Sequence, residues 1–200
     1  MEKDSRTKLI EAATSLFAKR GFTAVSIREL AETAGVNSAL ISYHFGGKEG
    51  LYEAVLEANF SRIAEAISAA EKMQLTPEAR IRYYTKAVNV LHKQNPFLIR
   101  LLHTELTNPT ACFETVIKKY LSQAYSFIYK SFAEGVASGY FSPTLDPAYA
   151  AISLAGIMNF YFIAKPLAQN FLPAAEDLDE SYLNQALSIY LNGVRRINYE

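Results

Sequence analysis

The residues best suited to bind another molecule gather on a short helix expected over residues 37–45. One side of that helix is small, uncharged and able to form hydrogen bonds, with one aromatic ring. Its members are Ser38, Ala39, Ser42 and Tyr43. Such side chains allow a helix to enter the major groove of double-stranded DNA, where they meet base edges and phosphates. The alternative interpretation is a solvent-exposed helix with a serine-rich face, although surface helices more often carry Lys and Glu there.

The residues around this helix predict the elements that position it. Ser26 followed three residues later by Glu29 is a capping box, which starts a preceding helix. Gly35 suits a tight turn between the two helices, because glycine adopts positive φ without a Cβ penalty. Gly46 and Gly47 then end the second helix. Two short helices joined by a glycine-containing turn form the outline of a helix-turn-helix.

Residues 6–56 resemble the DNA-binding domain of the TetR family of bacterial transcriptional regulators. A series of short motifs along this stretch carries the resemblance. They are Ile10, Ala13 and Phe17; Gly21-Phe22-Thr23; Ser26-Ile27-Arg28 with Leu30 and Ala31; Ala34-Gly35-Val36; Ser42-Tyr43-His44-Phe45; Lys48-Glu49 with Leu51; and Val55-Leu56. Each motif alone is weak, but the series is specific.

The resemblance implies which side chains meet DNA. It places five residues in the major groove, with Arg28 at its edge. The five are Asn37, Ser38, Ala39, Ser42 and Tyr43. It also matches four residues to positions that hold phosphates in the family: Ser26, Tyr43, His44 and Lys48. Leu40 and Ser42 depart from the residues commoner in the family, which leaves the base preference open.

Apolar periodicity and helix caps predict an all-α fold of about nine helices, with no strand pattern or internal repeat. Residues 1–47 are expected to form the helix-turn-helix DNA-binding domain. Residues 48–200 are expected to form a helical ligand-binding and dimerisation domain. A helix over 48–72 would connect the two as a rigid rod, so that motion in one part reaches the other.

Residues 147–164 contain no charged side chain, which raises the question of a membrane span. Asn159, several alanines and Pro166 close behind argue against a span. We therefore expect a helix buried on both faces, one against its own domain and the other against a second subunit. With a last helix over 179–197 it would form a four-helix homodimer interface through residues 147–197, and no membrane contact is predicted.

In the TetR family the carboxy-terminal domain typically holds an inducer pocket between its helices, so the resemblance implies a small-molecule effector. The candidate lining residues are aromatic or nearly uncharged. They are Tyr84, His103, Phe113, Tyr120, Met158, Asn159 and Tyr161. An apolar or aromatic ligand is predicted, because a cationic ligand requires a buried carboxylate and residues 147–175 contain none. Ordinary core packing is the alternative for all seven residues.

Charge and cysteine content limit the possible functions. The 200 residues include 20 basic and 20 acidic side chains, and residues 1–50 carry a net charge of +1. Phosphate contacts must therefore come from a few locally placed cations. Cys112 is the single cysteine, which excludes an intrachain disulfide. The polar start of the chain does not resemble a signal peptide, so a cytoplasmic protein is expected.

Catalytic, metal and cofactor sites are not predicted. The sequence has no recognisable set of nucleophile, base and orienting residue, no phosphate-binding glycine loop and no paired buried carboxylates. His92 and His103 fall on neighbouring helices, but no third metal ligand has a convincing spacing.

These observations predict a sequence-specific DNA-binding transcriptional regulator. It would be a repressor that a small apolar or aromatic ligand releases from a palindromic operator. A second hypothesis follows from the nearly neutral amino-terminal part: a helical protein that binds or sequesters a small molecule and carries a vestigial helix-turn-helix. Exchange of Tyr43 and Lys48 for alanine separates the two, because the second hypothesis predicts no loss of function.

Overall fold

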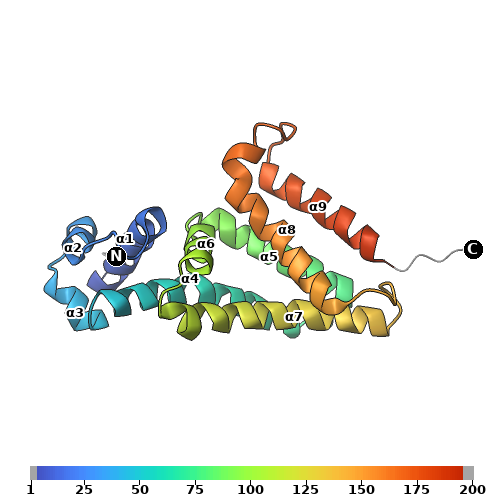
Figure 1. Cartoon of the computed structure of the whole chain (residues 1–200), viewed down its shortest axis with the longest axis horizontal. Coiled ribbons are helices and arrows are strands. Elements are labelled where there is room, and N and C mark those ends of the chain that lie inside the picture. Colours follow the sequence, from blue (N-terminus) through green and yellow to red (C-terminus); the bar gives the residue numbers. More distant parts are fainter. Residues whose placement is uncertain (1–3, 196–200) are drawn as a thin grey trace, which may run out of the picture. The chain divides into compact units, whose positions relative to one another are not determined.

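The computed structural model describes residues 4–195, which form nine α-helices and one π-helical turn (Figure 1). No β-strand is present in this part of the chain, whose single extended pairing is an isolated bridge between Phe141 and Arg195. The all-α prediction is therefore confirmed. Predictions that reach residues 1–3 or 196–200, among them the end of the helix expected over 179–197, lie partly outside the described residues.

The described residues pack into two compact units. The first unit holds residues 4–62 and 95–120, and the second holds residues 63–94 and 121–195. Two helices, α4 (Lys48–Glu71) and α7 (Lys118–Ala137), contribute residues to both units. The boundaries of these packing units thus differ from the predicted boundary between the DNA-binding and ligand-binding domains at residues 47 and 48. That functional boundary stays a prediction.

The first unit contains the amino-terminal helices and a shorter helix from later in the chain. Its elements are α1 (Ser5–Arg20), α2 (Ile27–Ala34), α3 (Ala39–Phe45), the start of α4, α6 (Leu98–Thr107), the π-helical turn Phe113–Ile117 and the start of α7. Helix α1 packs against α2, α3 and α6. The sequence pattern suggests one helix after Thr110, and the structure differs in that a π-helical turn precedes α7.

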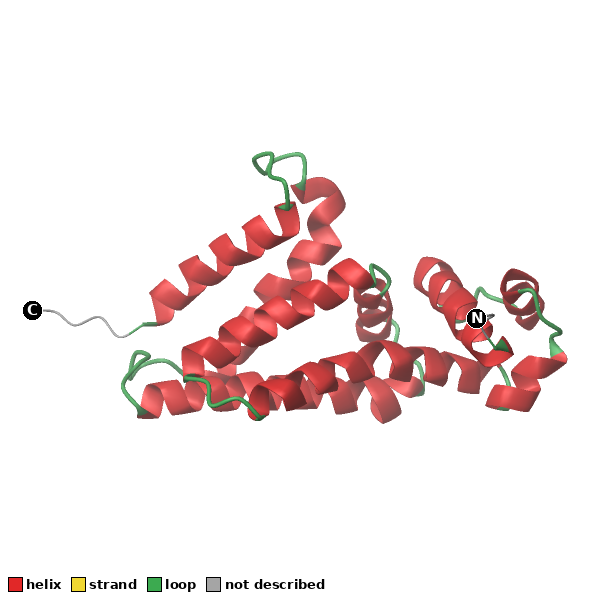
Figure 2. Ribbon diagram, turned by 180° about the vertical axis from the view of Figure 1, so that it is seen from behind, coloured by secondary structure: helices red, strands yellow, loops and turns green. Residues whose placement is uncertain are grey.

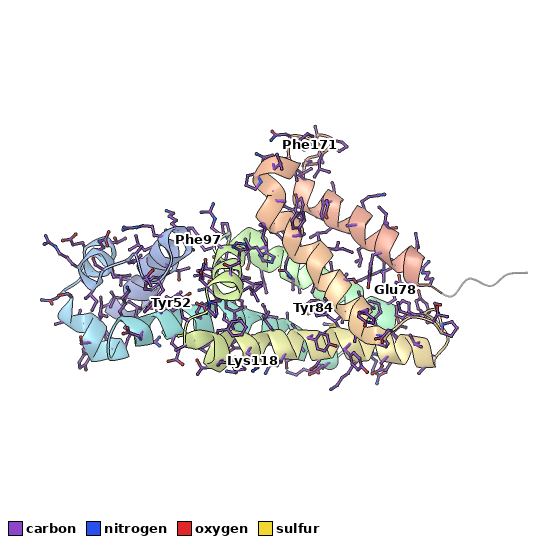
Figure 3. The ribbon with its side chains drawn as sticks, viewed as in Figure 1. Tyr52, Glu78, Tyr84, Phe97, Lys118 and Phe171 are labelled. Carbon is purple, nitrogen blue, oxygen red and sulfur yellow. The ribbon has the colours of Figure 1, made fainter. Side chains whose placement is uncertain are left out.

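An aromatic cluster and a buried carboxyl group form the centre of the first unit. Tyr52 is labelled in Figure 3. Its ring lies 4.9 Å from the Phe17 ring and 5.0 Å from the Phe22 ring, centroid to centroid. The Tyr52 hydroxyl donates a 2.6 Å hydrogen bond to the fully buried Glu105 carboxyl group. Because Tyr52 is on α4 and Glu105 on α6, this bond joins the helix that follows the predicted helix-turn-helix to α6.

The second unit is made of long helices with strong local start signals. Its elements are the later parts of α4 and α7, with α5 (Pro77–Gln94), α8 (Pro147–Ala168) and α9 (Leu178–Val194) (Figure 2). The Asp146 side chain caps α8 by accepting a 2.7 Å hydrogen bond from the Ala148 amide. Pro147 follows at the first helical position, where its missing N–H costs nothing.

One glycine in the second unit is required by packing. A Cβ atom built on Gly135 would stand 2.1 Å from the Phe141 ring. Phe141 is fully buried and its ring centroid lies 5.3 Å from that of Phe132. Only a residue without a side chain at position 135 therefore leaves room for Phe141 to pack back on Phe132 of α7.

Helix α8 differs from expectation at its end and on one face. It continues through Pro166 to Ala168, because a proline near the end of a helix removes a backbone bond only from the last turns. It is long and apolar enough to cross a membrane, and 28% of its most apolar stretch is buried within the chain. One face, which includes Leu154 and Met158, is buried, whereas Ile152 and Phe160 on the other are exposed. The predicted burial of the second face therefore requires a partner outside this chain.

Candidate nucleic-acid interface

The helix-turn-helix starts with the capping box that the sequence predicts. The Ser26 hydroxyl accepts a 3.2 Å hydrogen bond from the Glu29 amide, and the Ser26 amide donates a 2.9 Å bond to the Glu29 carboxylate. Arg20 forms an ion pair with the same carboxylate. The backbone bond from Ser26 and the hydrogen bond from Arg20 lower the pKa of Glu29 to about 2. The negative charge of Glu29 thus holds α2 to the end of α1.

The turn between α2 and α3 places the outer face of α3. Gly35 adopts the left-handed conformation with φ of 65°, as the tight turn requires. The Asn37 side-chain oxygen accepts a 2.9 Å hydrogen bond from the Ala39 amide, so Asn37 acts as a local cap for α3. Ile41 is fully buried and anchors the helix from below. The side chains opposite Ile41 are consequently presented outward.

Most of the residues predicted to meet DNA form one accessible set. Seven of the nine are exposed: Ser26, Arg28, Asn37, Ser38, Ala39, Ser42 and Tyr43. Tyr43 stands out, because 80% of its surface is exposed although it carries a large aromatic ring. Arg28 pairs with Glu32 one turn along α2. Their contact with DNA stays a prediction, and their accessibility is the condition that it requires.

The remaining two predicted residues, His44 and Lys48, are partly buried by specific contacts. A hydrogen bond of 2.9 Å joins the His44 Nε2 atom to the Ser5 hydroxyl at the start of α1. The Lys48 ammonium lies 4.4 Å from the centroid of the Phe22 ring. A cation above an aromatic face keeps its charge while its stem is held in place. Both side chains are therefore positioned before any ligand binds.

The structure adds a cation that the sequence analysis did not select. The Arg6 guanidinium on α1 lies 5.5 Å from the centroid of the Phe45 ring at the end of α3. Arg6 and His44 also line the same shallow groove. Because Arg6 is exposed and close to α3, it extends the basic rim of the motif. Its position in the first turn of a helix gave no sequence signal, since its aromatic partner is 39 residues away in the chain.

The seven residues predicted to bind a ligand are divided between the two units. His103, Phe113 and Tyr120 belong to the first unit, where His103 is exposed and the Tyr120 hydroxyl donates to the Glu57 carboxylate. The other four belong to the second unit: Tyr84, Met158, Asn159 and Tyr161. Tyr84, Met158 and Tyr161 are buried there, and Asn159 is half-buried. Ligand binding by this set stays a prediction.

In the second unit several of these side chains take part in polar contacts. The Tyr161 hydroxyl donates a 2.7 Å hydrogen bond to Asp179 on α9, and its ring stacks on Tyr182 at 4.0 Å. The Asn159 side-chain nitrogen donates a 2.9 Å hydrogen bond to the Ala155 carbonyl within α8. The contacts of Tyr161 thus join α8 to α9.

His92 is a polar group whose role the sequence analysis missed. It is 5% exposed and stacks on Phe162 with 4.2 Å between ring centroids. Its Nδ1 atom has no hydrogen-bond partner within residues 4–195. Burial lowers the pKa of His92 to about 4, so the ring is neutral at pH 7. The available signal was a histidine on a predicted amphipathic helix, for which the sequence favours a helix-surface or pocket position over a metal ligand.

A separate apolar cavity of about 640 Å³ lies along α8 and α9. Ile157, Tyr182 and Ile189 are among its lining residues, and Ile189 is exposed. None of the seven predicted ligand-binding residues lines it. The cavity is therefore distinct from the predicted ligand-binding set.

Comparison with known proteins adds an independent line of argument. The family "Bacterial regulatory proteins, tetR family" matches residues 9–55. The chain is 31% identical over 124 residues to the probable HTH-type transcriptional regulator YttP of Bacillus subtilis. This alignment covers 60% of this chain and 59% of YttP. It is 24% identical over 197 residues to the HTH-type transcriptional repressor NicS of Pseudomonas putida, which covers 96% of this chain and 93% of NicS.

The fold is also shared with a solved structure. The ketosteroid transcriptional regulator KstR2 of Mycobacterium tuberculosis superimposes with a TM-score of 0.80 at 19% identity, covering 98% of each chain. At this identity the likeness shows the fold alone. The match to YttP spans less than two thirds of that protein, whereas the match to NicS spans nearly all of it.

Proposed function

This chain belongs to the TetR family of bacterial transcriptional regulators, and from that premise we propose that it represses transcription as a homodimer that reads a palindromic operator. The family match over residues 9–55 supports the predicted kind of protein, a DNA-binding transcriptional regulator. The outer face of α3 is the observation that carries the proposal in this chain. It combines four exposed small or hydrogen-bonding side chains with an exposed tyrosine.

The cations around α3 supply the affinity for DNA. Residues 1–50 carry a net charge of only +1, so bulk attraction is weak. Lys48, Arg6 and Arg28 nevertheless lie on the elements that flank α3, and the first two rest on aromatic rings. Phosphate contacts from such cations orient the helix, whereas side chains on the face of α3 select bases.

The open face of α8 and α9 supplies the dimer interface. Exposed apolar side chains there include Tyr149, Ile152, Phe160, Ile163 and Ile189. Large exposed apolar side chains gathered on one helix face in this way mark an interaction surface. A second copy of the same face would cover it and form a four-helix bundle. Two α3 helices spaced by one turn of DNA, about 34–36 Å, would then read both halves of a palindrome.

A homodimer whose two α3 helices must be spaced by one turn of DNA can be controlled by a small molecule. The relatives YttP and NicS are named as a regulator and a repressor of transcription. A ligand that favours a state with another spacing of the α3 helices weakens DNA binding only by its preference for that state. We infer an apolar or aromatic effector held by the carboxy-terminal domain, because the predicted residues there, Tyr84, Met158 and Tyr161, are buried and uncharged. Such a regulator acts in the cytoplasm and performs no catalysis itself.

Retention of genomic DNA tests the proposal. Purified protein is incubated with fragments of its own genome, and the retained fragments are sequenced. The Tyr43→Ala/Lys48→Ala variant runs beside wild type, with Tyr129→Ala/Lys130→Ala on α7 as a matched control. The expected result is a short palindrome enriched by wild type and the control but lost in the first variant. If a folded dimer enriches no sequence at low salt, the proposal is wrong and the sequestering hypothesis gains support.

A further inference from the structure

A small polar groove runs between α5 and α9 in the second unit, on a different side of α9 from the open apolar face. Its volume is about 190 Å³. Glu180, Leu183 and Leu187 line it from α9, whereas the apolar cavity uses Tyr182, Gln185 and Ile189 of the same helix. A homodimer built through the apolar face therefore leaves this groove open. None of the seven residues predicted for the effector lines it either.

The floor of the groove holds a buried polar atom without a partner. Asn89 is 5% exposed, and its Oδ1 atom has no hydrogen-bond partner within residues 4–195. Thr85, one turn earlier on α5, is buried and donates its hydroxyl proton to the Ile81 carbonyl at 2.8 Å. The Thr85 oxygen can still accept a hydrogen bond. The floor thus holds one buried acceptor without a partner, the Asn89 Oδ1 atom, which requires a donor from water or from a bound molecule, and beside it the Thr85 oxygen can accept a further bond.

The rim of the groove is basic, and one of its cations is uncommitted. Arg82, Lys86 and Lys93 line it from α5, against one carboxylate, Glu180, from α9. Arg82 pairs with Glu78 and Lys93 pairs with Asp177, two carboxylates that do not line the groove. No ion pair is found for Lys86 among the residues that the structure describes. Its ammonium group is therefore available to an anion.

We propose that this groove binds a small hydroxy- or amino-carboxylate. The carboxylate of the ligand pairs with Lys86, within the field of Arg82 and Lys93. Its hydroxyl or ammonium group donates to the Asn89 Oδ1 atom and to Thr85, which satisfies the buried acceptors. The volume suits a molecule of this size, since it equals the liquid volume of about six waters. Such a ligand bridges α5 and α9 and stabilises the second unit.

The proposal is tested on the full-length protein by calorimetric titration and thermal unfolding. The probes are L-malate and L-glutamate, with propionate as a carboxylate without a second donor and ethanolamine as a donor without a carboxylate. Malate or glutamate is expected to bind. At a hundredfold excess over Kd it should raise the midpoint of thermal unfolding by about 5–10 °C. Propionate and ethanolamine should bind at least about tenfold more weakly, because each satisfies one half of the site.

Two groove variants and one control assign the binding to these residues. Lys86→Ala removes an exposed side chain, should leave folding intact and should weaken binding at least about tenfold. Asn89→Leu should also abolish binding, yet it should raise the unfolding midpoint of the ligand-free protein, because an unpaired buried amide is replaced by an apolar group. Lys130→Ala, an exposed lysine on α7, should bind like wild type.

Three results would overturn the proposal. The first is that neither malate nor glutamate binds, in which case water satisfies Asn89. The second is that propionate binds as tightly as malate, because the buried acceptors then play no part. The third is binding that Lys86→Ala leaves unchanged. All of these readings are independent of DNA, so they do not depend on the outcome for the operator.

Discussion

The hydrogen bond between Tyr52 and Glu105 allows a quantitative test of how α4 is joined to α6 in the first unit. The change Tyr52→Phe deletes one hydroxyl from a side chain that is 1% exposed. The Tyr52 ring keeps its contacts with Phe17 and Phe22. The Glu105 carboxyl group loses its 2.6 Å bond but keeps the amide and the hydroxyl of Thr110, at 3.1 and 3.0 Å.

The expected loss of stability follows from these contacts. Removal of one donor from a buried acceptor costs about 1–3 kcal/mol, and the cost is greatest where the acceptor is left unpaired. Because Thr110 still serves Glu105, we expect about 1–2 kcal/mol for Tyr52→Phe. For a chain of this size that lowers the midpoint of thermal unfolding by about 2–8 °C. Glu105→Ala should cost more, because it leaves the Tyr52 hydroxyl and both Thr110 donors without a partner.

Urea unfolding of wild type, Tyr52→Phe, Glu105→Ala and the double variant provides the measurement. The double-mutant cycle should show a coupling energy of at least about 0.5 kcal/mol, as contacting groups do. Tyr43→Phe is the matched control, since its hydroxyl is on a ring that is 80% exposed and should change stability by less than about 0.5 kcal/mol. If Tyr52→Phe is as stable as this control, the bond does not hold α4 to α6 and the reasoning fails.

Three further predictions concern DNA, assembly and pH. Arg6→Ala should weaken binding to all DNA sequences alike, because it removes a proposed phosphate contact and no base contact. Fluorescence anisotropy should also show that the slope of log affinity against log salt concentration falls by about one per subunit. Phe160→Glu places a charge on the open face of α8, so sedimentation should show monomer at concentrations where wild type is dimeric; a dimer would contradict the proposed interface. Burial raises the pKa of Tyr190 to about 12, so the neutral phenol favours the folded state. Its contribution is complete below the ordinary pKa of about 10 and is lost as the pH rises from there to about 12, so Tyr190→Phe should lose less stability over this range in urea unfolding.

The helix boundaries show what short-range chemistry determines. A cap involves residues within one turn of each other, so Ser26 with Glu29 and Asp146 with Pro147 start helices whatever surrounds them. Gly35 likewise ends α2 through its own backbone freedom. The motif built from such signals was recognisable along a continuous stretch of the chain. For the same reason the outer face of α3 followed from the residues of α3 alone.

Contacts between distant residues were decided only by the tertiary structure. Tyr52 contacts Glu105, which is 53 positions away in the chain, and Arg6 contacts Phe45, which is 39 positions away. No local sequence pattern predicts either pair. The seven predicted ligand residues shared a composition, but composition does not determine which helices pack together, and the structure divides them between two units.

The polar atoms of α5 illustrate the difference most directly. From the sequence, Asn89 and His92 are two polar residues on an amphipathic helix, and their types alone predict a satisfied or solvated position. Whether a buried polar atom finds a partner depends on which side chains the neighbouring helices bring to it. Helix α5 packs against α9, and its His92 stacks on Phe162 of α8, yet the Asn89 Oδ1 and the His92 Nδ1 atoms are left without a partner among residues 4–195. The sequence by itself therefore determined the helices and the face predicted to read DNA, through interactions within a few residues, whereas tertiary packing alone decided which buried polar groups lack a partner.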